Sequence, residues 1–190
     1  MSASTDLPGF VDPVLDAQAC FRAVMEAMSR PGRIERVPGL AEIPPGLSQA
    51  SAALLLTMVD RDSPLCLAAG GPARDWVRFH SGARLVPVAE AAFVLDPDAG
   101  LLDLPAGTEE EPEGGATLVV EVAALGSGRA LVLAGPGILG TSRLLVEGLP
   151  PALLRDWPAN RARFPRGVDV ILCAGDRIAA LPRGVAIEEG

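Results

Sequence analysis

The stretch Asp12–Ile34 reads DPVLDAQACFRAVMEAMSRPGRI and predicts a helix with signals at both ends. At its start, Asp12 can accept hydrogen bonds from the first turn, and Pro13 occupies a position where a missing N–H costs nothing. Asp16 is an equally plausible cap. Because acceptor side chains and proline are both favoured in the first turn, the sequence places the start of the helix within these few residues.

The same helix has a predicted apolar face and a clear stop. Apolar residues recur at steps of three and four, the spacing of one helix face, at Ala17, Phe21, Val24 or Met25, and Met28. Pro31 disfavours helical geometry at Arg30, and Gly32 can adopt the turn that follows. We therefore expect the helix to end at Ser29-Arg30 and to bury this face in the core.

The rest of the chain predicts helices and strands in alternation. Further helices are predicted over residues 48–59, 73–79 and 150–161, and strands over 65–69, 86–88, 91–95, 117–123, 129–134, 168–173 and 178–181. Gly126-Ser127-Gly128 predicts a hairpin between two of these strands, and Ala174–Arg177 predicts another. Helices interleaved with antiparallel strand pairs indicate an α/β fold, a three-layer sandwich with a mixed sheet.

The sequence predicts a single domain spanning residues 1–190. A chain of this length buries roughly 70% of its unfolded surface around one core. Residues 1–11 are expected to be flexible. Residues 96–115, which are rich in Asp, Glu, Pro and Gly, are expected to form a long surface excursion.

Charge and composition exclude several classes of partner. The 16 basic and 24 acidic residues give a net charge of −8, which disfavours non-specific binding to nucleic acid or anionic lipid. The first ten residues lack the basic and apolar regions of a signal peptide, and no apolar run approaches the ~20 residues that cross a bilayer. Cys20, Cys66 and Cys173 are widely spaced and predict reduced, mostly buried thiols in a cytoplasmic protein.

The residue types that the sequence lacks narrow its chemistry. All 16 basic residues are arginine, so a lysine Schiff base and a Walker-type phosphate loop are both excluded. His80 is the single histidine, which excludes a multi-histidine metal centre, and there is no tyrosine. We therefore expect no cofactor and no metal, and few acid–base groups besides carboxylates.

Gly135–Gly140 reads GPGILG and formally matches the dinucleotide-binding pattern GxGxxG. A nucleotide site requires that the preceding strand open a β–α–β unit, with a helix at the glycines and an acidic residue about 20 positions later. Here the preceding strand is the second arm of a predicted hairpin, and residues 141–147 allow two helical turns at most. Asp156 lies at the expected distance but within a predicted helix. A tight structural turn is the favoured interpretation.

Two small groups of polar residues are candidate sites. Asp60 and Asp62 follow a predicted helix and could ligate a divalent cation, although capping or solvation explains them equally simply. Arg78 and His80, together with Arg84, surround a Ser-Gly turn and offer donors suited to a phosphate or phosphonate oxygen. A structural hydrogen bond is the commoner role of a histidine at a helix end, and we favour it here.

Several of these motifs, taken in order, resemble the PhnH family, the H subunit of the bacterial carbon–phosphorus lyase system. The resemblance begins with the first helix and its Met-Ser-Arg-Pro-Gly stop, followed by Arg33-Ile34. It continues through four later segments: LLLTMVDRDSPLCL (54–67), RFHSG (78–82), GGATLVVEVAALGSGRALVLAGPG (114–137) and FPRGVDVILCAGDRIAALPR (164–183). Each motif alone is unspecific, whereas five in the same order over nearly the whole chain indicate family membership.

The resemblance implies a non-catalytic subunit of the carbon–phosphorus lyase core complex. In that system the H subunit assembles with the G, I and J subunits, and methylphosphonate is coupled to the ribose of ATP before its C–P bond is broken. The I subunit is regarded as the nucleosidase-like catalyst, and the J subunit carries the radical chemistry. The family fold resembles the large domain of pyridoxal-phosphate-dependent transferases, but this sequence lacks the cofactor lysine.

The sequence leaves an enzymatic alternative open. In it, the chain binds or converts a phosphonate-bearing nucleotide intermediate at a site made of Asp60, Asp62, Arg78 and His80. We favour a scaffold, because catalysis requires positioned acid–base groups that this sequence scarcely supplies. A scaffold acts through interfaces, where arginine is enriched, so Arg30 and Arg33 are candidate interface residues. The expected partners are chiefly the I subunit and, for the isolated chain, a second copy in a homodimer.

Overall fold

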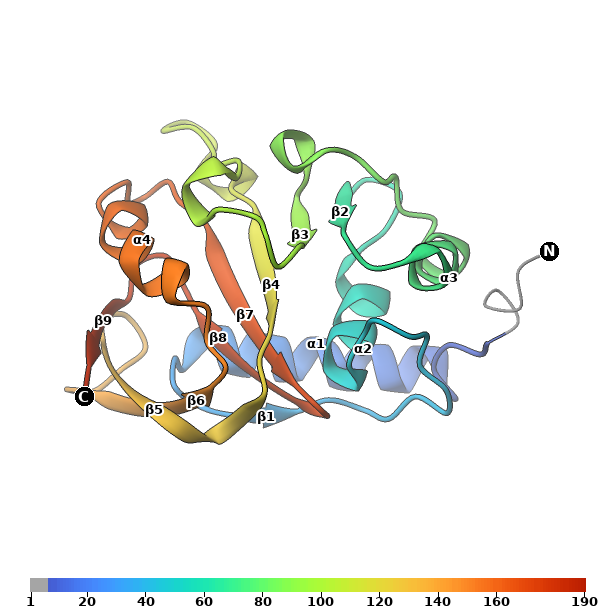
Figure 1. Ribbon diagram of the computed structural model, residues 1–190, viewed down its shortest axis with the longest axis horizontal. Coiled ribbons are helices and arrows are strands. Elements are labelled where there is room, and N and C mark those ends of the chain that lie inside the picture. Colours follow the sequence, from blue (N-terminus) through green and yellow to red (C-terminus); the bar gives the residue numbers. More distant parts are fainter. Residues whose placement is uncertain (1–6) are drawn as a thin grey trace.

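The computed structural model describes residues 7–190, which form an α/β fold (Figure 1). In chain order the elements are α1 (Pro13–Ser29), β1 (Glu35–Arg36), α2 (Gln49–Met58), β2 (Leu65–Leu67), α3 (Gly71–Ser81), η1 (Val88–Glu90), β3 (Phe93–Leu95), η2 (Leu101–Asp103), η3 (Pro112–Gly114), β4 (Thr117–Glu121), β5 (Ala124–Ala134), β6 (Ser142–Glu147), α4 (Pro151–Arg161), β7 (Asp169–Ala174), β8 (Arg177–Leu181) and β9 (Ala186–Glu189). The η elements are single turns of 3₁₀ helix.

The central layer is a six-stranded sheet with the strand order β1-β8-β7-β4-β3-β2. Strands β2, β3, β4 and β7 run parallel, whereas β8 pairs antiparallel with β7 and with the edge strand β1. Successive side chains of a strand point to opposite faces of the sheet. Other elements cover both faces, so the side chains on both faces are apolar. In β7, for example, Ile171 and Cys173 face one core cluster, and Val170 and Leu172 face the other.

Different elements cover the two faces of this sheet. Helices α1, α2 and α3 pack on one face, where the core includes Val24, Leu55 and Trp76. The three-stranded antiparallel sheet β6-β5-β9 and helix α4 cover the other face, where the core includes Leu131 and Trp157. The predicted α/β fold with a mixed sheet is confirmed, and a small second sheet forms much of the third layer.

Helix α1 begins and ends where the sequence predicts. Asp12 caps the helix by accepting hydrogen bonds from the N–H groups of Val14 and Leu15, at 3.1 and 3.0 Å. Arg30 follows the last helical residue, and its N–H still donates to the carbonyl of Glu26 at 3.0 Å. The proline and glycine that follow then turn the chain away from the helix axis.

The predicted buried face of α1 is wrong in part. Phe21 and Met25 are 47% and 53% exposed. The face toward the core carries four smaller side chains instead: Cys20, Ala23, Val24 and Ala27. Apolar residues of α1 cover more than one face, and periodicity alone does not decide which face packs inside. The smaller side chains are buried because they let α1 lie close to both α2 and β8.

Helix α2 is enclosed by other elements. Ser48 caps it as predicted, accepting a hydrogen bond from the N–H of Ser51 at 3.1 Å. Six successive residues, from Ala50 to Leu55, are buried, because α2 contacts α1 on one side, α3 on another and β7 beneath. Apolar character on all sides marks an internal helix of ten residues. Across residues 7–190, no helix combines the length and the apolar character needed to span a membrane.

The predicted hairpin around Gly126-Ser127-Gly128 is wrong. Strand β4 lies in the six-stranded sheet, whereas these three residues belong to β5 in the smaller sheet. β5 forms a hairpin with β6 instead, and its register shifts between Leu125 and Arg129, so the glycines form a bulge in β5. Residues 141–147 are therefore mostly strand and not helical turns. Residues 86–88, predicted as a strand, lead into η1.

The sequence predicts a flexible segment at residues 1–11 and a surface excursion at residues 96–115. Of the N-terminal eleven residues, the first six lie outside the described residues, and Phe10 forms an isolated β-bridge with Leu40. Residues 96–115 contain the turns η2 and η3, with exposed glutamates between them. Leu101 and Leu104 from this segment are nevertheless buried, so it also covers part of the core.

The stop of α1 packs directly against the turn of the β5–β6 hairpin. Gly137 has a φ of 81°, and a Cβ at this position would overlap the carbonyl oxygen of Ser29. Gly32 has a φ of 92°, and a Cβ there would overlap the hydroxyl oxygen of Ser142, the first residue of β6. Gly135–Gly140 is therefore the tight structural turn that the sequence favoured, because it joins antiparallel strands and opens no β–α–β unit.

We predict that Gly137→Ala destabilises the protein more than Gly140→Ala. Both glycines have positive φ, but a Cβ on Gly140 meets no atom within 4 Å. Gly140→Ala should therefore cost only the backbone term, about 1 kcal/mol, and Gly137→Ala about 2–4 kcal/mol, because Ser29 must also move. Urea unfolding measures both. Equal losses from the two variants would show that the close contact between turn and helix contributes nothing.

Candidate functional site

Asp60 begins the tight turn between α2 and β2. Its Oδ1 accepts hydrogen bonds from the N–H groups of Asp62 and Ser63, both at 2.9 Å. Hydrogen bonds from Ser63 and Asp62 lower the pKa of the Asp60 carboxyl. This carboxylate therefore satisfies donors of its own turn, which is the capping role that the sequence left open. Among the described residues, no group of three or more His, Cys, Asp or Glu side chains could hold a metal ion.

His80 lies in the last turn of α3 and fastens the segment that precedes α1. Its Nε2 lies 3.0 Å from the carbonyl oxygen of Leu7, and Nε1 of Trp76 donates to the same oxygen at 3.1 Å. Because a carbonyl oxygen only accepts, Nε2 of His80 must carry the proton. The imidazole also meets the rings of Trp76 and Phe79 edge-on, with centroids 5.0 and 5.1 Å apart. These contacts are those of a structural histidine.

The structure does not connect the four predicted site residues to one another. Asp60 bonds within its own turn and His80 bonds to Leu7. Arg78 is exposed beside a shallow depression lined by Phe79 and Gly82. Within residues 7–190, no hydrogen bond or ion pair joins a carboxylate of the α2–β2 turn to Arg78 or His80. Nothing in these contacts favours a phosphonate site here.

We predict that the hydrogen bond from His80 stabilises the N-terminal segment. His80→Phe keeps a ring between Trp76 and Phe79 but cannot donate to Leu7, so it should lower the free energy of unfolding by about 0.5–1 kcal/mol. His80→Gln retains a donor and should cost less. Hydrogen–deuterium exchange should show faster exchange across residues 8–11 in His80→Phe alone. Unchanged exchange and stability in that variant would contradict the tethering role.

The cysteines have the surroundings of inert thiols. All three are free, with Cys20 and Cys173 buried and Cys66 partly exposed. Burial raises the pKa of each thiol, most strongly for Cys173. A raised pKa keeps a thiol protonated at neutral pH and makes it a poor nucleophile. The predicted buried location of the thiols is confirmed for Cys20 and Cys173.

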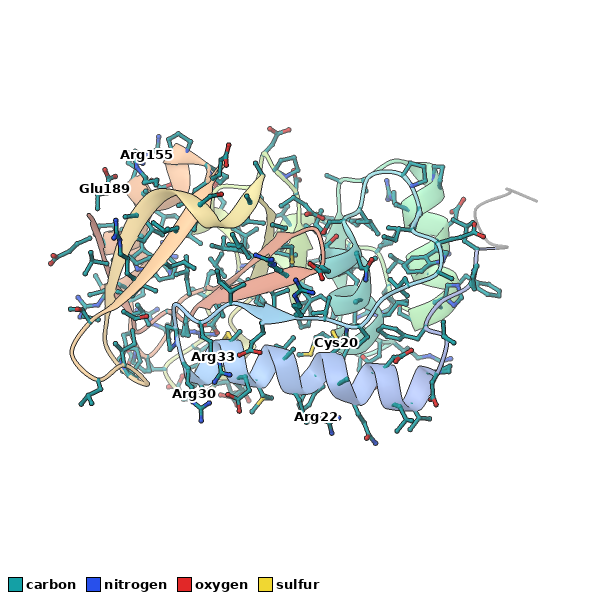
Figure 2. The ribbon with its side chains drawn as sticks, turned by 90° about the horizontal axis from the view of Figure 1, so that it is seen from below. Cys20, Arg22, Arg30, Arg33, Arg155 and Glu189 are labelled. Carbon is teal, nitrogen blue, oxygen red and sulfur yellow. The ribbon has the colours of Figure 1, made fainter. Side chains whose placement is uncertain are left out.

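The most unusual surface of the molecule is the outer face of α1. We use this name for the exposed apolar side chains that follow the helix, namely Val14, Leu15, Phe21 and Met25. Val14, Phe21 and Met25 follow one side of the helix and Leu15 flanks it, so these side chains form a strip that the exposed Gln18 interrupts. Figure 2 shows Arg22 on this side of α1, whereas Cys20 lies toward the core. Several large apolar side chains exposed along one helix are typical of an interaction site.

Charged side chains border the carboxyl-terminal end of this face. Arg30 pairs with Glu26 at 2.6 Å, and Arg33 approaches the same carboxylate at 3.5 Å (Figure 2). Both arginine side chains are more than half exposed, and Arg33 also pairs with Glu35. The two arginines predicted as interface residues therefore lie next to the outer face of α1.

The sequence contains a signal for this face, although its helical spacing alone predicts a buried face. Phe21 and Met25 follow the same three- and four-residue steps as a buried face. The distinguishing feature is side-chain size, since Cys20, Ala23 and Ala27 form a second stripe of small residues suited to close packing. A helix with one small and one large apolar stripe is typical of an element covered on both sides.

A family model and two relatives of this chain all indicate the same protein family. The family model described as "Bacterial phosphonate metabolism protein (PhnH)" matches residues 8–188. The chain is 40% identical over 187 residues to "Alpha-D-ribose 1-methylphosphonate 5-triphosphate synthase subunit PhnH" of Rhizobium meliloti (strain 1021), covering 94% of each chain. It is 39% identical over 168 residues to "Putative C-P lyase subunit protein HtxG" of Stutzerimonas stutzeri, covering 87% of this chain and 83% of the relative.

Proposed function

Since this chain belongs to the PhnH family of bacterial phosphonate metabolism proteins, we propose that it is a non-catalytic subunit of a carbon–phosphorus lyase complex. Both relatives described above are named as subunits, one of the synthase of α-D-ribose 1-methylphosphonate 5-triphosphate and one of a C–P lyase. In this role the chain supports the conversion of methylphosphonate and ATP to that triphosphate in the cytoplasm. The catalytic groups come from other subunits.

The outer face of α1 is the observation that carries this proposal. Its aromatic and aliphatic side chains stay in contact with water although the helix has a second, buried face. Covering apolar surface contributes roughly 25 cal/mol per Å², so a partner placed on this face would gain stability without any change in the fold of this chain. Specific interfaces bury on the order of 1,200–2,000 Å² in total, which requires elements beside α1 as well.

We infer that a second copy covers this face in the isolated protein and that the I subunit covers it in the full complex, beside the G and J subunits. Arginine suits such an interface, because its planar guanidinium forms paired hydrogen bonds with carboxylates. Arg22 follows Phe21 on α1 and points away from Cys20, and Arg30 and Arg33 lie at the carboxyl-terminal end of the helix. Carboxylates on the partner would add to the ion pairs that these two arginines form with Glu26 and Glu35.

The residue types of this chain and their hydrogen bonds support a non-catalytic role. The family likeness suggests a fold related to the large domain of pyridoxal-phosphate-dependent transferases, and the absence of lysine from this sequence removes the residue that would hold that cofactor. His80, the single histidine, is hydrogen-bonded to the carbonyl of Leu7, and Asp60 accepts hydrogen bonds within its own turn. General acid–base catalysis needs such groups placed at a substrate.

We predict that Phe21→Glu separates this chain from its partners. A charge in the middle of the outer face of α1 would be buried without a partner, so affinity for the other subunits should fall at least about thirtyfold. Self-association of the isolated chain should weaken in parallel. Co-purification with tagged G, I and J subunits measures the first effect, and analytical ultracentrifugation measures the second.

Phe79→Glu is the matched control for this experiment. Phe79 is 67% exposed, carries the same ring and lies on α3 instead of α1. Its substitution should leave assembly unchanged, and both variants should retain the far-ultraviolet circular dichroism of the parent. If Phe21→Glu assembles as well as Phe79→Glu, the outer face of α1 is not the surface that joins the complex.

A further inference from the structure

A cavity of about 550 Å³ lies at the carboxyl edge of the parallel strands. Strand β3 ends in it at Leu95, strand β4 ends in it at Glu121, and the residues that follow β2 contribute Ala68 and Ala69. One rim is the loop from residue 96 to residue 100, and the opposite rim is the first turns of α4. The volume falls within the range of natural small-molecule pockets, which is roughly 300–1,000 Å³.

The cavity lies where the connections that follow β2 and β3 leave toward opposite faces of the sheet. The connection from β2 to β3 runs through α3, whose Trp76 belongs to the core on the α1 side of the sheet. The connection from β3 to β4 runs through η2, whose Leu101 belongs to the core on the opposite side. Neighbouring parallel strands whose connections leave toward opposite faces open a crevice between their carboxyl ends, where α/β proteins commonly bind ligands.

The charge of the lining selects the kind of ligand. Four carboxylates line the cavity, those of Asp96, Asp98, Glu121 and Asp156, against one guanidinium, that of Arg155. Arg155 is already paired, with Nε 2.8 Å from Oδ1 of Asp156 and Nη2 3.1 Å from its Oδ2. The amino end of α4 adds only about half a positive charge. The cavity is therefore electronegative and disfavours phosphate and phosphonate groups.

Several acceptor oxygens in this cavity are not used by the protein. Asp96 accepts a hydrogen bond from the N–H of Asp98 through Oδ1 only, at 2.9 Å. Glu121 accepts one from the N–H of Ser48 through Oε1 only, at 2.9 Å. In the described part of the chain, the carboxylate of Asp98 accepts no hydrogen bond and forms no ion pair. The remaining walls are largely apolar, through Leu95, Leu101, Leu118, Val120 and Leu153.

We propose that this cavity binds a small organic cation, a protonated amine or amidine attached to an apolar ring or chain. The cationic group would face the carboxylates of Asp96 and Asp98, and the apolar body would lie against the leucines. A charged donor paired with carboxylates in a partly enclosed site gives shorter and stronger hydrogen bonds than neutral groups do. The inference stands on the cavity and its charges, and it does not rest on the subunit role proposed above.

Nuclear magnetic resonance with three probes of one shape tests the proposal. Benzamidine, benzamide and benzoate carry a positive, a neutral and a negative group on the same ring. We expect benzamidine to shift the backbone amides of Ala68, Asp98 and Ala152 with saturation in the millimolar range, and benzoate to leave them unchanged. Equal shifts from benzoate would overturn the charge assignment. No shift from benzamidine up to about 20 mM, or shifts only elsewhere, would overturn the site.

Two variants and a matched control locate the binding. Asp98→Asn removes one charge but keeps the N–H that bonds to Asp96, and it should weaken benzamidine about fivefold. Glu109→Gln removes one charge from an exposed loop outside the cavity and should change affinity less than about twofold. Ala152→Phe fills the rim from the surface of α4 and should abolish the shifts. Unchanged benzamidine affinity in Asp98→Asn and Ala152→Phe would contradict the proposal.

Discussion

The close packing of α1 on β8 and α2 determines how the other layers are arranged. Cys20, Ala23 and Ala27 occupy the contact, so the helix axis lies near the sheet and larger side chains cannot turn inward. Phe21 and Met25 are consequently left on the outside. The size of a few small residues thus creates both the buried face of the helix and its exposed apolar strip.

The residues that end α1 contact the β5–β6 hairpin, which covers the other face of the central sheet. Ser29 meets Gly137 in the β5–β6 turn, and Gly32 meets Ser142 at the start of β6. The Pro-Gly sequence after α1 and the Gly-Pro-Gly turn, which are far apart in the sequence, therefore form one contact between layers. Their glycines are needed for close approach and positive φ, and no nucleotide needs to be invoked to explain them.

Local signals predicted those parts of the fold that local interactions determine. Asp12 and Pro31 mark the ends of α1, and Ala174–Arg177 connects β7 to β8 as expected. Long-range pairing decided the parts that were predicted wrongly or not at all. Gly126-Ser127-Gly128 resembles a hairpin turn, but β4 pairs with β3 and β7, and β5 pairs with β6 and β9. A local turn sequence does not determine which of several distant strands a given strand pairs with.

Some candidate site residues could be recognised in the sequence, whereas the cavity could not. Asp60 and His80 are residue types that serve catalysis or local structure equally well, and only their observed hydrogen bonds distinguish the two roles. The cavity at the carboxyl edge was not predictable, because its lining comes from segments between Gly46 and Asp156 that meet only in the folded chain. Arg30 and Arg33 stay predicted interface residues, and both lie at the end of the helix that carries the strip.

Hydroxyl-radical footprinting of the assembled complex can show whether the outer face of α1 is covered, because it reports the exposure of individual side chains without a substitution. Phe21 and Met25 react readily in a protein that exposes them, and both are about half exposed in the single chain. If the outer face of α1 joins this chain to its partners, their modification rates should fall several-fold on assembly, while that of Phe79 stays constant. Equal rates for Phe21 and Met25 in the free chain and in the complex would contradict that claim.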